Sequence, residues 1–325
     1  MVKPFDWDSR IGRRVRLRDL HILFAVVQYG SMAKAGVHLG MSQSAVSQAI
    51  AALERALGVR LLDRTSRGVE PTMYGSALLR RGLSAFDELR LGVKEIEFLA
   101  DPAAGEVRIA CPEAIAAGFL PPIIERLSRR YPRVTLQVFG VEIGAENYRM
   151  EFPELRERKA DVRFTLLPRP LEGELAHELN AEVLCYDRIC LAAGAQSPWA
   201  RRRKIDLADL VDEPWILPFS DRPGARAVME AFHMRGLAPP RVSVATQSVH
   251  LRTFLSMSGR FIVALPVSIL RLHAELFFLK ELRIELPLPP MPLAVVTLKN
   301  RTLSPTVELL VECARDVAKS MSKNR

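Results

Sequence analysis

Hydrogen-bonding side chains gather on one side of a helix that the sequence predicts between Ser42 and about Leu57. The Ser42 hydroxyl can start this helix by accepting a hydrogen bond from an exposed backbone N–H. At about 100° per residue, one face is polar and the opposite face is apolar. The polar residues are Gln43, Ser44, Ser47 and Gln48, and the apolar residues are Ala45, Val46, Ala49, Ile50 and Leu53. Glutamine can bond adenine bidentately and serine can bond bases or phosphates, so the polar face suits the DNA major groove. A merely solvated helix face would show the same pattern.

A short hairpin is predicted after this helix, over residues 61 to 71, where apolar and polar residues alternate around a Ser-Arg-Gly tip. Arg64 and Arg67 would project from it. Arginines on such a projection can neutralise phosphates or enter a narrow minor groove. Surface arginines are common, however, so these two support DNA binding only in combination with the polar helix.

Two further helices are predicted before the polar one. Apolar residues at helical spacing run from Leu17 to residue 29, where Gly30 interrupts them. Ser31 can then cap a short second helix, and Gly40 with Met41 forms a tight break before the third. Two helices joined by a short glycine turn form a helix-turn-helix pattern.

A helix of some 28 residues is predicted from Thr72 to about Leu99. Leu79, Phe86 and Val93 recur at heptad spacing, with Leu89 and Ile96 three residues on, so this seam favours a partner helix. The alternative is a helix buried on its own domain. Pro102 and Gly105 then disfavour a continuing helix, which places a linker at residues 100 to 106.

Composition limits the function classes. The chain has 325 residues, which suggests two or three domains, and a formal net charge of +9, which permits nucleic-acid binding without proving it. It lacks the run of about 18 apolar residues that spans a bilayer, and no apolar core follows the N-terminal arginines. We therefore expect a cytoplasmic protein without membrane contact. The four cysteines show no metal-ligand spacing and favour buried thiols, with only the Cys185 and Cys190 pair worth testing for redox sensing.

Strands and helices alternate beyond the linker, which predicts a largely parallel α/β fold. Expected strands cover residues 107–110, 134–138, 188–193, 215–217, 241–244 and 261–264. One amphipathic helix is predicted between the first two strands, carrying apolar residues from Ile115 to Leu127. Ser304 as cap and Pro305 at the first helical position announce the last helix.

The first third of the chain closely resembles the DNA-binding region of LysR-type transcriptional regulators. The resemblance rests on Ser-Gln-Ser-Ala-Val-Ser-Gln-Ala-Ile, which starts at Ser42, followed by Leu-Glu-x-x-Leu-Gly-x-x-Leu-Leu-Asp-Arg, which starts at Leu53. Looser matches to the family's effector domain are Gly105-Glu-Val-Arg-Ile-Ala, Phe119-Leu-Pro-Pro, Tyr131-Pro and Gly259-Arg-Phe-Ile-Val-Ala-Leu-Pro.

The resemblance implies an α+β multidomain protein with a winged helix-turn-helix, a long linker helix and a two-lobed α/β effector domain like the periplasmic binding proteins. The corresponding ranges are 1–71 (with an N-terminal extension, 1–16), 72–100 and 101–325; lobe 1 covers about 107–182 and 288–325, and lobe 2 about 183–287. It implies double-stranded promoter or operator DNA, a small-molecule effector, RNA polymerase and other copies of the chain, as a homodimer or homotetramer, as partners. Cofactors and metals are not expected.

The resemblance also assigns site residues. DNA contacts fall on Ser31, Ser42, Gln43, Ser44, Ser47, Gln48, Arg64 and Arg67, with Ser31 as a phosphate contact at a helix start. Gln48 stands where many members have Arg, and Gly36 stands where Ala is usual and should slightly loosen the second helix. The effector pocket falls on Pro112, Glu113, Gly140, Val141, Pro218, Ser220, Thr246, Gln247 and Ser248.

Glu113 is the distinctive residue of this pocket. Many relatives have Ser or Thr after the first strand to bind an effector carboxylate, whereas this chain reads Cys111-Pro112-Glu113. A carboxylate there would repel an anion and could accept hydrogen bonds from hydroxyls or pair with a cation. This predicts a hydroxyl-rich, sugar-like or cationic effector. The alternative is that Glu113 points to solvent or caps the helix that follows it.

Two rival function classes have less support. For an enzyme, the chain lacks a GxSxG elbow, a P-loop, a suitably placed GxGxxG and an HExxH motif, and its six histidines lack ligand or triad spacing. A transport or storage binding protein would not need the N-terminal DNA-binding pattern. We therefore expect a regulator without catalytic activity.

Overall fold

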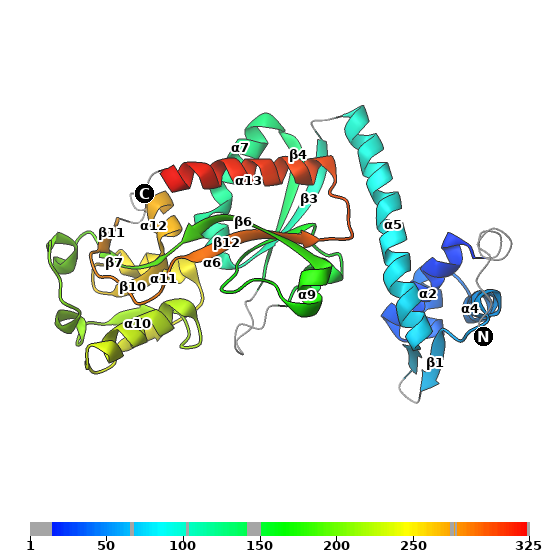
Figure 1. Ribbon diagram of the computed structural model, residues 1–325, viewed down its shortest axis with the longest axis horizontal. Coiled ribbons are helices and arrows are strands. Elements are labelled where there is room, and N and C mark those ends of the chain that lie inside the picture. Colours follow the sequence, from blue (N-terminus) through cyan, green and yellow to red (C-terminus); the bar gives the residue numbers. More distant parts are fainter. Residues whose placement is uncertain are drawn as a thin grey trace. The chain divides into compact units, whose positions relative to one another are not determined.

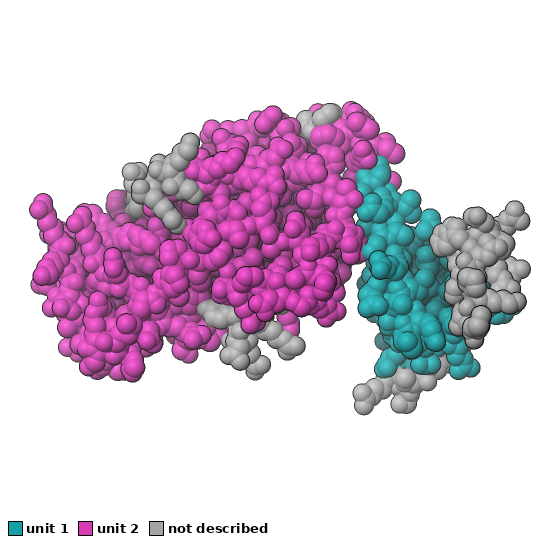
Figure 2. All heavy atoms as spheres, in the orientation of Figure 1, with its two compact units in different colours: residues 1–92 teal, residues 93–325 magenta. Residues whose placement is uncertain are grey.

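The computed structural model describes residues 15–65, 68–101, 104–141, 151–273, 276 and 278–323. The first fourteen residues of the predicted extension, Arg67 of the predicted wing and residues 102 and 103 of the predicted linker lie outside this part. The chain divides into two compact units, Met1–Gly92 and Val93–Arg325 (Figure 2).

The first unit contains the predicted helix-turn-helix and its wing. Its elements are α2 (Leu17–Tyr29), α3 (Met32–Leu39), α4 (Gln43–Leu57), β1 (Leu62–Thr65), β2 (Gly68–Pro71) and most of α5 (Met73–Ala100). The first three helices end at glycines with left-handed backbones, namely Gly30, Gly40 and Gly58. Ser42 caps α4 as predicted, because its Oγ accepts a hydrogen bond from the Ala45 N–H at 3.2 Å. Ser31 precedes α3, but its hydroxyl makes no capping hydrogen bond, so that prediction was wrong.

Close backbone approaches shape this unit at several glycines, among them Gly36 and Gly75. A Cβ on Gly36 would lie 2.7 Å from the Met41 carbonyl oxygen, and the Met41 N–H donates to the Gly36 carbonyl at 2.8 Å. Gly36 therefore permits the tight turn between α3 and α4, and the prediction that it merely loosens α3 was incomplete. A Cβ on Gly75 would lie 2.0 Å from the Leu61 carbonyl oxygen, so α5 begins directly against the wing backbone.

The heptad seam of α5 divides into two halves with different surroundings. Leu79 and Phe86 pack against the core of the first unit, and the Phe86 ring meets the Phe24 ring edge-on at 5.5 Å. Beyond them the apolar side chains are exposed: Leu89 by 51%, Val93 by 56%, Ile96 by 68% and Leu99 by 73%. Burial on its own unit is thus confirmed for the first half of the seam, whereas the second half is an exposed apolar stripe, for which pairing with a partner helix stays a prediction.

The second unit contains two mixed β-sheets (Figure 1). The first has the strand order β4-β3-β5-β12-β6, and the second has the order β11-β7-β10-β8-β9. The prediction of a largely parallel fold was only partly right. Strand β3 is parallel to β4 and β5, but β12 runs antiparallel to both β5 and β6, and β10 runs antiparallel to β7. The chain passes from one sheet to the other between β6 and β7 and between β11 and β12, and these four strands all have antiparallel neighbours.

The first lobe is built around the first sheet. Its elements are β3 (Ala104–Cys111), α6 (Glu113–Gly118), α7 (Leu120–Arg130), β4 (Arg133–Gly140), α8 (Pro153–Arg156), β5 (Val162–Leu166), α9 (Gly173–Glu178), β6 (Leu179–Asp187), β12 (Met291–Leu298) and α13 (Pro305–Lys323). Helices α7 and α13 pack together over one face of the sheet (Figure 1). The single helix predicted over Ile115 to Leu127 is two helices, because the chain breaks at Phe119, whose side chain is fully buried. Helix α13 begins at Pro305 as predicted, but the Ser304 hydroxyl is buried without a hydrogen-bond partner among the described residues, so this side chain does not cap the helix.

The second lobe is built around the second sheet. Its elements are β7 (Ile189–Gly194), short 3-10 turns at Pro198–Arg201 and Leu207–Leu210, β8 (Trp215–Leu217), α10 (Pro223–Met234), β9 (Val242–Ala245), α11 (Val249–Ser256), β10 (Ile262–Pro266), α12 (Val267–His273) and β11 (Leu279–Leu282). Separate apolar cores cover the two faces of its sheet, one beneath α10 and one beneath α11 and α12.

A buried ion cluster joins distant segments of the first lobe. The Asp161 carboxylate accepts hydrogen bonds from the Arg108 backbone N–H at 2.9 Å, from Arg108 Nη2 at 2.9 Å and from Arg301 Nη2 at 2.8 Å. Only 3% of the Asp161 side chain is exposed. Burial alone would raise its pKa, but the hydrogen bonds and charges of the two arginines outweigh this and hold the pKa below its usual range.

No helix in the described ranges combines the length and the apolarity that crossing a membrane requires.

Candidate functional site

The polar face predicted on α4 is exposed to solvent. Gln43, Ser44 and Gln48 are exposed and Ser47 is half-buried. Val46, Ile50 and Leu53 on the opposite side are buried in the core of the first unit. The cap of the helix extends this face, because Ser42 Oγ and Ser44 Oγ lie 2.9 Å apart, within hydrogen-bond distance. The side chains that can read a base edge therefore sit on the first turns of α4, held by a rigid apolar seam behind them.

The predicted wing is a two-stranded antiparallel hairpin. Arg64 pairs with Val69 in the ladder, although the structure describes only the backbone of Arg64. The Val69 N–H donates to the Gly30 carbonyl at 3.0 Å, and a Cβ on Gly68 would lie 2.5 Å from that same oxygen. This contact fastens the wing beside the start of α3, where Ser31 lies. Sequence reasoning did not foresee it, since nothing local relates Gly30 to Gly68.

A cavity of about 400 Å³ lies between the two lobes of the second unit. Six of the nine predicted effector residues line it, four from the first lobe and two from the second. These are Pro112, Glu113, Gly140, Val141, Pro218 and Gln247. Ser220, Thr246 and Ser248 do not line it. Ser248 instead uses its Oγ to cap α11, accepting a hydrogen bond from the Leu251 N–H at 3.2 Å, and Thr246 Oγ1 accepts one from the Ser248 N–H at 3.2 Å.

Glu113 does something that neither sequence hypothesis proposed. Its Oε1 accepts hydrogen bonds from the Val249 N–H at 2.9 Å, from the His250 N–H at 3.3 Å and from Ser248 Oγ at 3.3 Å. Glu113 belongs to the first lobe, at the start of α6, and its partners begin α11 in the second lobe. It therefore caps a helix, but one 135 residues further along the chain rather than its own.

Two buried donors in this cavity lack partners among the described residues. Arg252 is 5% exposed, and although its Nη1 donates to the Ala264 carbonyl at 2.7 Å, its Nε makes no hydrogen bond. The Nε2 of Gln247 also makes none. Burial lowers the pKa of Arg252 to about 10, and the Glu113 charge opposes this. Sequence reasoning missed Arg252, although its spacing from Val249, Thr253 and Ser256 on the buried face of α11 is a signal that could have found it.

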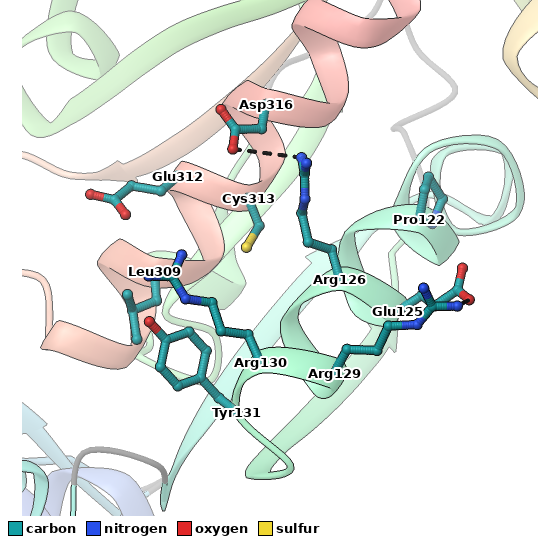
Figure 3. A pocket seen from close by; sticks show the side chains of 10 residues that line it. All are labelled: Pro122, Glu125, Arg126, Arg129, Arg130, Tyr131, Leu309, Glu312, Cys313 and Asp316. Atoms are coloured by element: carbon teal, nitrogen blue, oxygen red, sulfur yellow. Dashed lines mark hydrogen bonds and ion pairs between the residues drawn. The ribbon is translucent and has the colours of Figure 1, made fainter.

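A larger hollow of about 650 Å³ lies on the outer surface of the first lobe, between α7 and α13. Figure 3 shows charged side chains around it. Arg126 pairs with Asp316 at 3.5 Å, Arg129 pairs with Glu125, and the Arg130 guanidinium lies 5.4 Å from the centre of the Tyr131 ring. Its cations thus already have partners, and it involves one lobe only, so we regard the inter-lobe cavity as the candidate effector site.

The thiols have no reactive arrangement. Cys185 lies on β6 in the first sheet and Cys190 on β7 in the second, and both are buried and form no disulfide. Burial raises the pKa of Cys190 to about 12 and that of Cys111 to about 11. The thiolate, which is the reactive form, is therefore scarce at neutral pH. Within the described ranges, no three His, Cys, Asp or Glu side chains converge as metal ligands would.

Comparison with protein families gives two separate matches. Residues 17–76 match the family model of the bacterial regulatory helix-turn-helix protein, lysR family, and residues 100–319 match the LysR substrate binding domain. The chain is a LysR-type transcriptional regulator. Members of this family are transcriptional regulators rather than enzymes, and the combination of a DNA-binding and an effector-binding domain follows from the two matches.

Individual relatives agree with this assignment along most of the chain. The regulator is 28% identical over 315 residues to YfeR of Shigella flexneri, an uncharacterised HTH-type transcriptional regulator, covering 95% of this chain and 96% of that protein. It is 30% identical over 251 residues to the HTH-type transcriptional regulator GbpR of Azospirillum brasilense, covering 75% of this chain and 69% of that protein.

Solved structures show the same fold. Full-length OxyR from Pseudomonas aeruginosa is 20% identical with a TM-score of 0.62, and the match covers 94% of this regulator and 97% of that chain. HinK, a LysR family transcriptional regulator from Pseudomonas aeruginosa, is 23% identical with a TM-score of 0.52, covering 94% and 99%. The predicted order of a winged helix-turn-helix followed by an α/β effector domain is thereby confirmed.

Proposed function

We propose that this regulator binds operator DNA through Ser42, Gln43, Ser44, Ser47 and Gln48 at the start of α4, with phosphate contacts from Ser31 and from Arg64 and Arg67 of the wing. The observation that carries the proposal is the exposed polar face of α4, backed by buried Val46 and Ile50. The family assignment supports it. Such a rigid helix can place two amide side chains against base edges in the major groove.

A gel shift with the DNA upstream of the coding region tests this binding. The substitution Gln48→Ala should weaken specific binding by about 5- to 150-fold, the value of one bidentate base contact. The matched control is Gln28→Ala, because Gln28 is an exposed glutamine on α2 in the same unit. Equal affinities of both variants, or binding insensitive to salt, would contradict the proposed reading face.

We further propose that the regulator is a homodimer or homotetramer whose copies pair through the exposed α5 stripe of Leu89, Val93, Ile96 and Leu99. Exposed apolar side chains on one face of a helix favour a partner with the same face. Functionally, we assign residues 1–71 to DNA binding, 72–100 to dimerisation and 101–325 to effector binding. We place the regulator in the cytoplasm, where bacterial promoter DNA and RNA polymerase, its expected partner in transcription, are found.

Control by a small molecule in the inter-lobe cavity completes the proposal. Residues of both lobes line the cavity, and its volume is within the usual range for small-molecule sites. The expectation of a sugar-like or cationic effector rested on a free Glu113 carboxylate. Because Glu113 Oε1 already accepts three hydrogen bonds from the start of α11, that support is weakened.

A further inference from the structure

We propose that Glu113 serves as a built-in anion for the N-terminus of α11, so that the effector offers one anionic group to Arg252 and Gln247 and an apolar body to the rest of the cavity. This inference rests on the proposed effector role of that cavity. It names the chemical class of the ligand and the group that selects it.

Glu113 fills a place that suits an anion. The unpaired N–H groups at the start of a helix attract negative charge, and α11 has eight residues. Two of its first N–H groups and the hydroxyl of Ser248 already donate to Glu113 Oε1. A carboxylate carried by a ligand would therefore have to displace the protein's own carboxylate and would meet its charge.

The unmet donors flank the groups that bind Glu113, because Gln247 directly precedes the cap residue Ser248 and Arg252 lies within α11. Arg252 Nε and Gln247 Nε2 are both buried without partners in the described part of the chain, and both residues line the cavity. A buried donor without an acceptor carries a free-energy cost that an acceptor on the ligand would remove. Arg252 remains protonated at neutral pH, so an anionic acceptor gains more than a neutral one. The other lining cation, Arg222, lies 3.5 Å from the Asp221 carboxylate.

The remaining wall is mostly apolar. Val141, Leu166, Ile189 and Met291 contribute to it, together with several prolines. A sugar would leave its hydroxyls against these side chains without partners, which is costly. A dicarboxylate would bring its second charge either to this wall or to Glu113. A monocarboxylate with a hydrocarbon body suits both the unmet donors and the apolar wall.

Thermal shift and calorimetry on the full-length protein test the ligand class with hexanoate, adipate, hexanol and glucose. We expect hexanoate to bind at millimolar concentration and the other three to bind at least about tenfold more weakly. Gln247→Ala should weaken hexanoate by about tenfold or more, whereas Gln137→Ala, an exposed glutamine on β4, should leave it unchanged. Tighter binding of glucose than of hexanoate, or no binding of hexanoate, would overturn the assignment.

A second experiment tests the role of Glu113 with acetate as the probe. Glu113→Ala should lower the melting temperature by about 2–4 °C through loss of the cap. Acetate should restore part of the lost melting temperature in Glu113→Ala. It should change the melting temperature of the wild type no more than chloride does, and the same should hold for the control Glu230→Ala, which alters an exposed residue on α10. The melting temperature of Glu113→Gln, which keeps an acceptor oxygen, should lie between those of the wild type and Glu113→Ala. If acetate affects all variants equally, the built-in anion is refuted. Neither experiment involves DNA, so failure of operator binding would be a separate result.

Discussion

Removing the Asp161 carboxylate should lower the stability of the second unit more than most single substitutions. Asp161→Asn removes a charge that is 3% exposed and puts an amide N–H₂ among donors from Arg108 and Arg301, whose side chains are 27% and 10% exposed. Breaking a buried ion cluster by removing one partner costs about 3–5 kcal/mol. For a unit of this size, about 2–4 °C per kcal/mol predicts a melting temperature lower by about 6–20 °C.

The control is Glu182→Gln, which removes a bidentate but exposed pair. Arg315 Nε and Nη2 donate to Glu182 at 2.7 and 2.8 Å, and the two side chains are 45% and 38% exposed. Exposed pairs contribute about 0–1 kcal/mol. Urea unfolding at neutral pH, followed by far-UV circular dichroism, measures both variants. A loss for Asp161→Asn no larger than that for Glu182→Gln would refute the reasoning.

The pH dependence gives an independent check on Asp161. Its pKa in the folded protein is below the ordinary value, so its contribution is fully present above the unfolded pKa and is lost as the pH falls through the folded pKa. The difference between the wild type and Asp161→Asn should therefore be constant from neutral to mildly acidic pH. It should shrink only below about pH 4, the usual range of an unfolded aspartate. A stability difference between the wild type and Asp161→Asn that shrinks as the pH is raised would contradict this reasoning.

Three further predictions concern the dimer seam, the thiols and the start of α5. Ile96→Asp should raise the dimer dissociation constant by at least about tenfold in sedimentation measurements, whereas Lys94→Asp, away from the stripe, should change it little. Because burial raises the pKa of Cys190 to about 12, a thiol-reactive disulfide reagent should label it only after unfolding; rapid labelling of the native protein near pH 7.5 would contradict this. Gly75→Ala should reduce the free energy of unfolding of the first unit by about 1–3 kcal/mol in urea titrations, because its Cβ would lie 2.0 Å from the Leu61 carbonyl oxygen; an unchanged midpoint would show that the backbone yields there.

The sequence by itself determined the DNA-binding end of this protein. Periodicity places Val46 and Ile50 in the core and Gln43 and Gln48 on the surface, because a helix of known pitch leaves no other arrangement. Helix ends were equally predictable where a glycine adopts a left-handed backbone, as at Gly30, or where a serine caps its own helix, as at Ser42. These features depend on residues within a few positions of one another, and the order of domains follows from the motifs they build.

Tertiary structure alone decided which groups meet in the inter-lobe cavity. Glu113 Oε1 accepts from Val249 across 136 positions, and Arg252 Nε and Gln247 Nε2 lack partners among the described residues because their surroundings bury these two atoms. Six of the nine positions that the family resemblance predicts line this cavity, yet the resemblance did not predict the hydrogen bonds that they make. Hydrogen bonding and desolvation are set by which segments meet in space. For that reason Glu113, the distinctive residue of this pocket in the sequence, binds the start of α11 in the same protein.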